Sequence, residues 1–420
     1  MRYIRTGSFK RLFSSKRQSF DNKEDEEGMA KMCSLSNDQQ ENNESFNSST
    51  GSPKSRRYSR TSSFRRLFSI KPRSSDYSND QEEEYNDGNF QRRTWKNFTF
   101  QQVFRATNGF ASDNLVGKGG YAEVYKGVLE DGQEIAVKRL TKVSNDERKE
   151  KEFLTEIGTL GHVNHPNVLS LLGCCIDNGL YLVFQFSSRG SVASLIHDEN
   201  SPTMDWKSRY KICVETALGL HYLHKVCPRR IIHRDIKTSN VLVTADFRPQ
   251  ISDFGLAKWL PSQWTHHSIV PIEGTFGHLA PEYFMHGFVD EKTDVFAFGV
   301  LLLEIISGKK PVDGSHQSLH SWAKPILNQG DNGKLVDPRL EGAYNTKQLN
   351  RLAFAASLCI RKSSKWRPIM SEVLQVMLME GEIDKERWKI PKEEEEDEVW
   401  SLEDLECECD SAFSSLSLTN

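Results

Sequence analysis

The chain has 420 residues, of which 37% are hydrophobic and 27% are charged, and its formal net charge is −3. A hydrophobic fraction this low indicates a folded centre diluted by polar tails, and the near-balance of charge gives no reason to expect a nucleic-acid partner. The eight cysteines include no Cys-x-x-Cys pair. The composition therefore argues against a zinc site or a disulfide framework and favours reduced thiols.

No targeting segment is predicted. The N-terminus is basic, but no apolar stretch follows it as a secretory signal would require. The longest apolar run, 295–306, contains Glu304 and is too short to span a bilayer. Arg2 stands where N-myristoylation requires glycine. We therefore expect a soluble, cytoplasmic protein, and leave open a peripheral place at the plasma membrane or a partly nuclear one.

Residues 1–93 are predicted to be disordered, because a segment this polar cannot bury enough surface to offset its ordering entropy. They contain an internal repeat, RTGSFKRLFSSKR at 5–17 and RTSSFRRLFSIKPR at 60–73. In each copy a serine, Ser8 or Ser63, stands three residues after an arginine, which is a spacing typical of basophilic phosphorylation sites.

The basic repeats suggest a membrane anchor. Residues 1–20 carry six basic residues and no acid, and each basic residue near an anionic leaflet contributes about 1 kcal/mol. Phosphate on Ser8 or Ser63 would weaken such an anchor by repulsion. A soluble tail with incidental phosphorylation sites, or a nuclear-import patch, explains the same residues equally well.

From Trp95 to about residue 385, strand and helix patterns alternate. Residues 94–111 form an aromatic segment with regular apolar spacing. Strands are predicted at 124–125, 135–137 and 181–184. A helix follows the second strand, with Ser144 or Asn145 as its cap and Phe153, Ile157 and Leu160 recurring at helical spacing.

The second half of this region is predicted to be mainly helical. Asp205 can cap a helix that runs towards His224. Residues 294–306 are apolar almost all round, which is typical of a helix buried in the centre of a lobe. Residues 386–420 read as an acidic, disordered tail.

The strongest functional signal is IIHRDIKTSNVLVTADFRPQISDFGLA at 231–257. Phosphoryl transfer needs a carboxylate that orients a hydroxyl and oxygen ligands for two magnesium ions. We expect Asp235 to orient the substrate hydroxyl, Lys237 to neutralise charge on the moving phosphate, and Asn240 and Asp253 to hold magnesium. The alternative, a helix-capping cluster in a loop, does not explain the joint pattern.

A glycine-rich stretch between two predicted strands supplies candidate nucleotide contacts. Glycines let backbone amides approach phosphate oxygens closely. The candidates are Val116, Gly117, Lys118, Gly119, Gly120, Tyr121, Ala122, Glu123 and Val124. Alanine stands where a third glycine is usual, and strand continues beyond it, whereas a Rossmann loop would open a helix.

Lys138 follows this loop on a strand, at the distance expected for a lysine that grips the α- and β-phosphates. Its orientation needs a carboxylate from the next helix. Glu156 is our choice, because it precedes the inward-facing Ile157. Glu152, one turn earlier, is the alternative. A solvent-exposed face of the helix, with no role in the site, would also explain the presence of both glutamates.

Two contacts are expected downstream. Glu282, in Ala-Pro-Glu, would be buried, and Arg367 is its natural partner because a lone buried carboxylate is costly. Asp294, at the start of the buried helix, is expected to cap the loop that holds Asp235.

These motifs resemble the eukaryotic protein kinase family over roughly residues 112–380. The resemblance implies an α+β, bilobal fold with a β-rich N-lobe and a helical C-lobe, an ATP-dependent transfer with Mg²⁺, and a kinase domain at 112–385 preceded by a pre-kinase segment at 94–111. It also implies that adenine contacts are made by the backbone of Gln185 and Phe186, next to Phe184, with Ala136 and Leu242 completing the nucleotide site.

The finer resemblance is to plant receptor-like cytoplasmic kinases. It rests on Phe-Thr-Phe at 98–100, Ala-Thr-Asn-Gly-Phe at 106–110 and Gly-Thr-Phe-Gly-His-Leu-Ala-Pro-Glu at 274–282. The family usually has Tyr at the position of His278. With Ser-Phe-Lys-Arg-Leu-Phe at 8–13 of the N-terminal tail, the chain looks most like the subgroup that binds the plant Rho-type (ROP) GTPases. This resemblance implies that the GTP-bound form of such a GTPase is a partner.

Serine/threonine specificity follows from this resemblance, and Thr275 supports it because it could bond both Asp235 and Lys237. Arg234 implies control by a phosphate on the activation segment, which starts at Asp253 and closes with Ala-Pro-Glu at 280–282. Thr265, Ser268 and Thr275 are the candidate acceptors, with Ser268 or Thr265 favoured as regulatory. A kinase-fold scaffold that binds the GTPase with incidental catalysis is the competing function.

Overall fold

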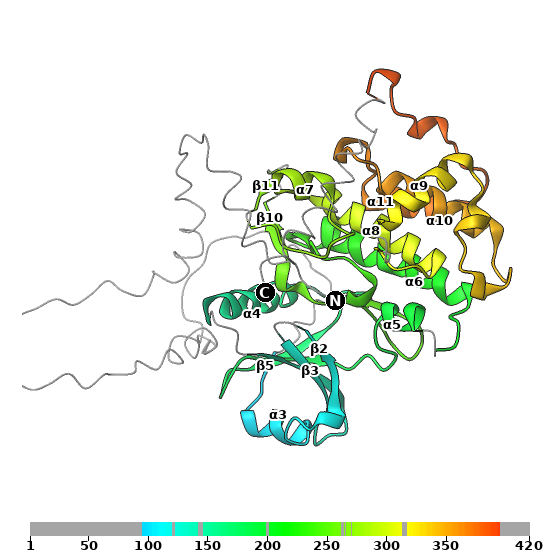
Figure 1. Ribbon diagram of the computed structural model, residues 1–420. Helices are drawn as coiled ribbons and strands as arrows, with labels where there is room; N and C mark the ends of the chain where they lie inside the picture. Colours follow the sequence, from blue (N-terminus) through cyan, green and yellow to red (C-terminus); the bar gives the residue numbers. More distant parts are fainter. Residues whose placement is uncertain are drawn as a thin grey trace, which may run out of the picture. The chain divides into compact units, whose positions relative to one another are not determined.

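The computed structural model describes residues 95–394, apart from residues 120–121, 142–145, 199–200, 262–263, 265, 270 and 313–316. The repeats within residues 1–93 and most of the acidic tail lie outside the described residues. The described part confirms the expected fold class: a small lobe built on a β-sheet is joined to a larger helical lobe (Figure 1).

The small lobe is built on a six-stranded sheet. In sheet order its strands are β1 (Lys96–Asn97), β5 (Leu171–Cys175), β6 (Tyr181–Gln185), β4 (Glu134–Leu140), β3 (Ala122–Val128) and β2 (Leu115–Lys118). Ile135 and Val137, two residues apart on β4, are fully buried, as expected when alternate side chains point to one face. This face carries the lobe's core.

The aromatic segment at 94–111 contributes to the same core. Its strand β1 pairs in parallel with β5, and its helix α3 (Phe100–Ala106) begins with a capping box between Thr99 and Gln102. Phe98 and Val103 are buried in one cluster with Ile135 and Val137. Phe100 and Phe110 pack against that cluster. From Trp95 onward the segment is therefore part of the folded small lobe.

Helix α4 (Asp146–Leu160) is the main helix of the small lobe. Its inward face is formed by Phe153, Ile157 and Leu160, all buried, at the spacing that the sequence suggested. The proposed caps, Ser144 and Asn145, lie outside the described residues. The helix packs on η5 (Phe254–Leu256), the turn that follows Asp253.

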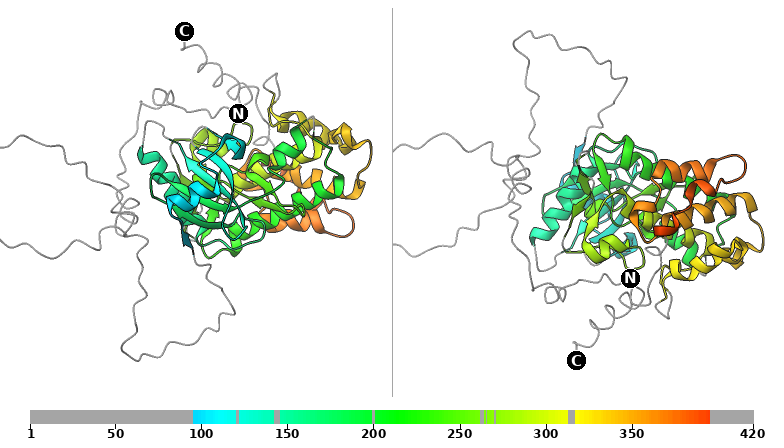
Figure 2. Two further views of the ribbon diagram at one scale, coloured as in Figure 1. Left: turned by 90° about the horizontal axis from the view of Figure 1, so that it is seen from below. Right: turned by 90° about the horizontal axis from the view of Figure 1, so that it is seen from above.

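The helical lobe is organised around α8 (Glu291–Ser307), on which α6 (Trp206–His221), α9 (Leu319–Gln329) and α10 (Thr346–Cys359) pack (Figures 1 and 2). The helix begins at a capping box between Asp290 and Thr293. It ends at Gly308, whose φ of 68° favours glycine. Every residue from 293 to 307 is buried, as predicted for 294–306.

Other elements complete the lobe. They are α5 (Val192–His197), α7 (Pro281–His286), α11 (Met370–Leu378) and the paired short strands β7 (Arg230–Ile232) with β10 (Lys258–Leu260), β8 (Val241–Val243) with β9 (Pro249–Ile251), and β11 (His267–Ser268) with β12 (Phe288–Val289). The helix expected to run towards His224 leaves α-helical geometry at His221, and Tyr222–Val226 forms a π-helical turn.

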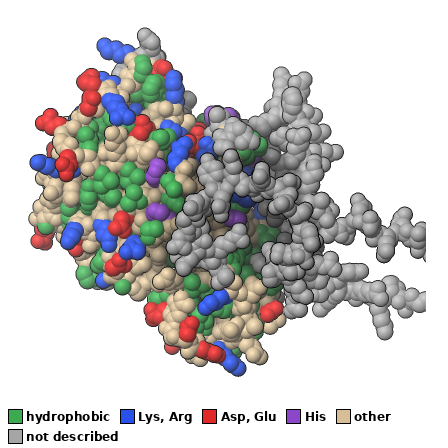
Figure 3. Space-filling model, turned by 180° about the vertical axis from the view of Figure 1, so that it is seen from behind, with side chains coloured by type: hydrophobic (Ala, Val, Ile, Leu, Met, Phe, Trp, Pro, Cys, Tyr) green, Lys and Arg blue, Asp and Glu red, His purple; other side chains and the backbone are tan. Residues whose placement is uncertain are grey.

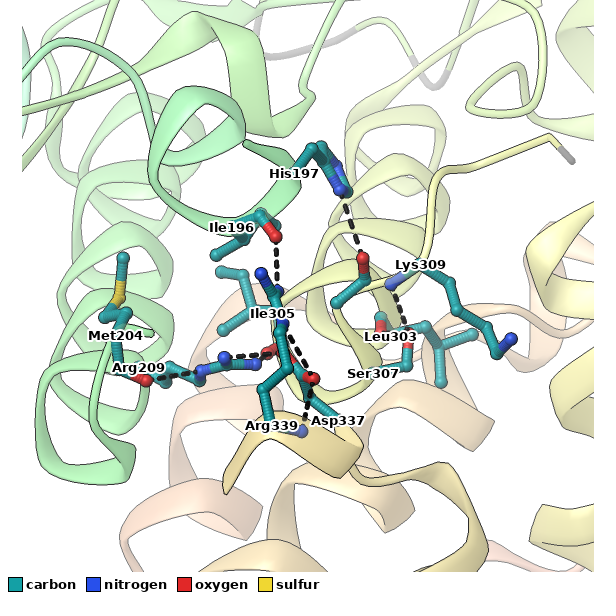
Figure 4. A network of polar contacts seen from close by, with 11 residues as sticks. Ile196, His197, Met204, Arg209, Leu303, Ile305, Ser307, Lys309, Asp337 and Arg339 are labelled. Atoms are coloured by element: carbon teal, nitrogen blue, oxygen red, sulfur yellow. Dashed lines mark hydrogen bonds and ion pairs between the residues drawn. The ribbon is translucent and has the colours of Figure 1, made fainter. Parts of the chain in front are cut away.

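A buried arginine network fixes the C-terminal end of α8 (Figure 4). Arg209 of α6 is fully buried and donates to the carbonyls of Met204 and Ile305, each at 2.9 Å, and to Asp337 at 2.7 Å. Arg339 also donates to Asp337, at 2.8 Å. Because the guanidinium of Arg209 satisfies a carboxylate and two carbonyls, its burial is compensated and α6, α8 and the turn at 337–339 are held together.

The surface carries charges of both signs. On the face seen in Figure 3, acidic and basic side chains of the described residues are interspersed and do not gather by sign. Within residues 95–394, apart from the gaps, none of the helices combines the length and apolar character needed to cross a membrane.

Candidate active site

Asp294 anchors the loop that carries the candidate catalytic residues. Its carboxylate accepts the backbone N–H groups of His233 and Arg234, each at 2.8 Å, and lies 2.9 Å from His224 Nε2. Burial disfavours the ionised carboxylate, but the hydrogen bond and charge of His224 outweigh it and lower the pKa of Asp294. The loop contact predicted for Asp294 is present.

Asp235 lies at the centre of a buried hydrogen-bond cluster. Its Oδ2 accepts from Lys237 Nζ at 2.7 Å and Asn240 Nδ2 at 2.9 Å, and its Oδ1 accepts from Thr275 Oγ1 at 2.7 Å. Lys237 Nζ also donates to Thr275 Oγ1, at 2.6 Å. The structure thus brings Thr275, forty residues along the chain, onto both side chains, which fixes the carboxylate in one orientation.

Asn240 and Asp253 lie at one end of the β8–β9 hairpin. The carbonyl of Asn240 accepts from Ser252 N at 2.8 Å, so the residue before Asp253 is bonded directly to Asn240. The side-chain Nδ2 of Asn240 donates twice to Asp235, so its oxygen is the end available to a cation. The Asp253 side chain is 40% exposed and held at a φ of 66°, in the left-handed region.

This donor set fits magnesium. Among the described residues, no group of three or more His, Cys, Asp or Glu side chains could hold a metal ion by itself. Mg²⁺ is usually held by one or two carboxylates together with substrate phosphates and water, and not by an all-protein cage. An amide oxygen of Asn240 and a carboxylate of Asp253 match that requirement.

Lys138 on β4 joins the two lobes. Its Nζ lies 2.7 Å from Glu156 Oε2 on α4 and 2.8 Å from Asp253 Oδ1. Burial disfavours the ammonium, but the charges of Asp253 and Glu156 outweigh it and raise the pKa of Lys138. Lys138 in turn lowers the pKa of Asp253 to about 2. The lysine and Asp253 are therefore both charged at neutral pH.

Glu156 is the carboxylate that contacts Lys138, and its side chain is almost completely shielded from solvent. Its side chain is 3% exposed, and burial raises the pKa of Glu156 despite the opposing charge of Lys138. A buried carboxylate of this kind depends on its partner for compensation. The position of α4, which carries it, therefore decides whether the Lys138 pair forms.

The glycine-rich stretch forms the β2–β3 hairpin, whose turn is closed by Gly119 N donating to Ala122 O at 2.8 Å. Gly120 and Tyr121 lie outside the described residues. The side chain of Glu123 bonds Arg139 at 2.6 Å on the neighbouring strand, so it braces the sheet.

The nucleotide contacts expected of the remaining loop candidates stay a prediction. Gly117 lies in β2 and Val124 in β3, Lys118 is exposed and lies 3.4 Å from Glu123, and Val116 is 53% exposed.

The adenine contacts expected from the backbone of Gln185 and Phe186 stay a prediction, but strand pairing limits which of their backbone groups can make them. Strand pairing already uses both amides, because Gln185 N lies 3.3 Å from Ser170 O and Phe186 N lies 3.4 Å from Glu134 O. These residues can offer a base only their carbonyl oxygens. Among the described residues, the N–H of Ser187 meets no hydrogen-bond acceptor, so it is an available donor that the sequence analysis did not name.

Strand register explains why the sequence analysis did not name Ser187. The pairing of Ile135 with Gln185 decides which amides β6 consumes, and no residue type in the sequence signals where that pairing stops. Ala136 on β4 and Leu242 on β8 are half-buried apolar side chains, and their contact with a base stays a prediction.

Glu304 is a second residue that the sequence analysis passed over. It is 1% exposed, yet it accepts from Thr238 Oγ1 at 2.9 Å and lies 2.7 Å from His278 Nε2 and 3.1 Å from His197 Nε2. Burial disfavours its charge, but the two histidines outweigh it and lower the pKa of Glu304 to about 2. Its one sequence signal is an acid inside an otherwise apolar helix.

The Glu304 cluster connects three elements. Thr238 belongs to the turn after Lys237, His278 to the segment after Thr275, and His197 to α5. Figure 4 shows His197 pointing from α5 towards α8. Through Glu304, His278 thus ties the segment after Thr275 to the loop that carries Asp235; the kinases that this chain resembles usually have Tyr at this position.

The regulatory candidates are differently placed. Ser268 lies in β11 with an exposed side chain, whereas Thr275 is committed to Asp235 and Lys237. Arg234 donates to Leu256 O at 2.8 Å and to the hydroxyl of Tyr283. Thr265, Ser8 and Ser63 lie outside the described residues.

Comparison with known proteins agrees with this geometry. Residues 110–377 match the family described as protein tyrosine and serine/threonine kinase. The chain is 54% identical over 298 residues to a probable receptor-like serine/threonine-protein kinase of Arabidopsis thaliana, covering 70% of this chain and 51% of the relative.

Two further relatives from Arabidopsis thaliana are receptor-like cytosolic serine/threonine-protein kinases. The chain is 55% identical to RBK2 over 283 residues, and 50% identical to RBK1 over 286 residues. The alignments cover 67% and 68% of this chain, and 61% of each relative. The chain therefore spans about half to three fifths of the length of these curated relatives.

Proposed function

The chain belongs to the protein tyrosine and serine/threonine kinase family, and we propose that it transfers the γ-phosphate of ATP to serine and threonine hydroxyls of protein substrates. The observation that carries the proposal is the pair of clusters around Asp235 and Lys138, which Asp253 and Asn240 connect. The charged side chains that the proposal assigns to phosphoryl transfer thus lie close together and are held in place by hydrogen bonds.

The residues act mainly by position and charge. Asp235 already accepts a hydroxyl, that of Thr275, and in the reaction it would orient the hydroxyl of the substrate and receive its proton. Lys237, 2.7 Å from Asp235, would offset the charge of the moving phosphoryl group. Lys138, held by Glu156, would grip the α- and β-phosphates.

The cofactor sites follow from the same donor set. Bound magnesium neutralises charge on the phosphates, and Asn240 and Asp253 would hold it. The backbone of the glycine-rich hairpin would cover the phosphates, and the Gln185 carbonyl with the Ser187 N–H would receive adenine between Ala136 and Leu242.

Serine/threonine specificity has two supports. Thr275 bonds both Asp235 and Lys237, the arrangement that the motif resemblance links to this specificity. The relatives are serine/threonine-protein kinases. We extend the proposal to a cytoplasmic signalling kinase that acts with the GTP form of a plant Rho-type GTPase, which the motif resemblance and the basic repeats support.

The competing function is a scaffold of kinase fold with incidental catalysis. The intact Lys138–Glu156–Asp253 cluster favours the enzyme, since a pure scaffold has no need to keep three buried or half-buried charges in register. The experiment that separates the two is phosphate transfer from ATP to a generic basic protein.

Transfer should be measured for the chain alone, with GTP-loaded and with GDP-loaded plant Rho GTPase, and with Asp253→Asn as the blank. We expect the chain alone to transfer phosphate, and the GTP-loaded GTPase, but not the GDP-loaded one, to stimulate this transfer. Activity that is indifferent to the GTPase would keep the kinase and reject the partner, and wild-type transfer no higher than the blank would favour the scaffold.

Activating phosphorylation is expected on the activation segment, at Ser268 or Thr265, and not at Thr275. The Ser268 side chain is exposed, whereas a phosphate on Thr275 would break its bonds to Asp235 and Lys237. Mass spectrometry of active protein tests this. Active protein unmodified at both Ser268 and Thr265 would contradict it.

A further inference from the structure

Trp95 packs directly on the end of the helix that carries Glu156. A Cβ built on Gly161 would lie 2.3 Å from Trp95 Cζ2 and 3.0 Å from Cη2, so the indole occupies the space that any side chain at 161 would fill. Gly161 is the first residue after α4, and its N–H donates to Ile157 O at 2.9 Å. The contact is therefore made with the last turn of α4 itself.

The residues that follow Trp95 are fixed to the sheet. Lys96 and Asn97 pair in parallel with Gly173 and Cys174 of β5, and Phe98 N donates to Cys174 O at 2.9 Å. At Gly173 a Cβ would lie 1.9 Å from the carbonyl oxygen of Lys96, so glycine is required for this approach. Phe98 then enters the buried core of the small lobe.

Residues 95–98, which include the edge strand β1, thus connect the sheet to the C-terminal turn of α4. The sheet carries Lys138 on β4, and α4 carries Glu156 five residues before Gly161. The Lys138–Glu156 contact of 2.7 Å requires that the helix keeps its distance from the sheet. A contact at the last turn of α4 limits how far that turn can move away.

We propose that Trp95 is a positioning residue for the reaction: by packing on Gly161 it holds α4 where Glu156 pairs with Lys138. The inference rests on the proposed function for its catalytic consequence, but the packing itself is testable without catalysis. It gives the segment before the kinase domain a defined role. Without the indole, α4 is expected to spend less time in the position that orients Lys138 towards the nucleotide phosphates.

The test compares Trp95→Ala and Trp95→Phe with Trp388→Ala. Trp388 is a matched control, because it is a half-buried tryptophan in a short turn, Glu386–Trp388, at the other end of the described chain. We expect Trp95→Ala to raise KM for ATP and to lower kcat/KM for ATP by about 10- to 100-fold, with KM for a peptide substrate nearly unchanged. Trp95→Phe should recover most of the loss.

Hydrogen exchange gives a readout that needs no activity. In Trp95→Ala, peptides covering residues 150–161 should exchange faster, while those of α8 should be unchanged. Trp388→Ala should change neither measurement. Equal exchange of residues 150–161 in wild type and Trp95→Ala would overturn the proposal, whatever the kinetics show.

A double-mutant cycle makes the contact specific. Gly161→Ala places a methyl group against the indole, so alone it should also speed exchange of residues 150–161. In the Trp95→Ala background the same substitution should add little, because the obstructing ring is gone. Additive effects would show that the two residues act independently, and would overturn the proposal.

Failure of the kinase proposal is distinguishable from failure of this inference. If wild type transfers no phosphate but the exchange cycle shows coupling between Trp95 and Gly161, the proposed activity fails and the packing role stands. If wild type is active and the cycle shows no coupling, the positioning role fails alone.

Discussion

Replacing Asp253 by Asn is expected to lower the rate of phosphate transfer by at least about 10³-fold, which is the scale of removing one charged group that stabilises a transferring phosphoryl group. The substitution preserves size but removes the charge of a carboxylate whose pKa is held at about 2 by Lys138, so that it is ionised at any working pH. An amide oxygen cannot bind magnesium with the same charge. Steady-state transfer from ATP measures the loss.

The matched control is Asp246→Asn. Asp246 is an exposed aspartate between β8 and β9, and its partners are Thr244 and Arg248. We expect this variant to keep wild-type activity, and both variants to keep the thermal unfolding midpoint of the wild type, because Lys138 retains Glu156 when Asp253 becomes neutral. Full activity of Asp253→Asn would reject the assignment of the cation site.

The sequence predicted the fold class and the contacts that depend on residue type. The buried helix at 294–306 was recognisable because nearly every side chain in it is apolar, and α8 extends only a few residues beyond that range. The contact between Glu282 and the buried Arg367 was also predictable, since a carboxylate largely removed from water needs a partner, although Glu282 itself is only half-buried.

What the sequence could not predict depends on register and on packing at a distance. Strand pairing decides that the N–H groups of Gln185 and Phe186 are used, and no nearby residue type indicates that the N–H of Ser187 is left without an acceptor among the described residues. Glu304 looked like an interruption of an apolar run, because its histidine partners lie at 197 and 278. The same holds for Gly161, because the sequence does not show that Trp95 packs against it.

The second large effect is expected from Arg367→Met, which should lower the free energy of unfolding by about 3–5 kcal/mol. The guanidinium of Arg367 is fully buried, and all five of its N–H groups are used. Two of them meet Glu282 at 2.8 Å each, and three meet the carbonyls of Arg361, Lys292 and Lys362. Removing the arginine leaves a carboxylate that is 16% exposed without its counter-charge.

Urea unfolding measures this loss, and two further variants identify its cause. Arg387→Met is the control, because Arg387 is 52% exposed and its ion pair with Glu372 is long, at 3.6 Å, so we expect a change within about 0.5 kcal/mol. Adding Glu282→Leu to Arg367→Met should recover part of the stability, since the unpaired charge is then gone and only the three carbonyls remain unsatisfied. If Arg367→Met costs no more than Arg387→Met, the Glu282–Arg367 pair does not hold the segment after Thr275 to the helical lobe. That segment would then have to be fixed by the bonds of Thr275 and His278.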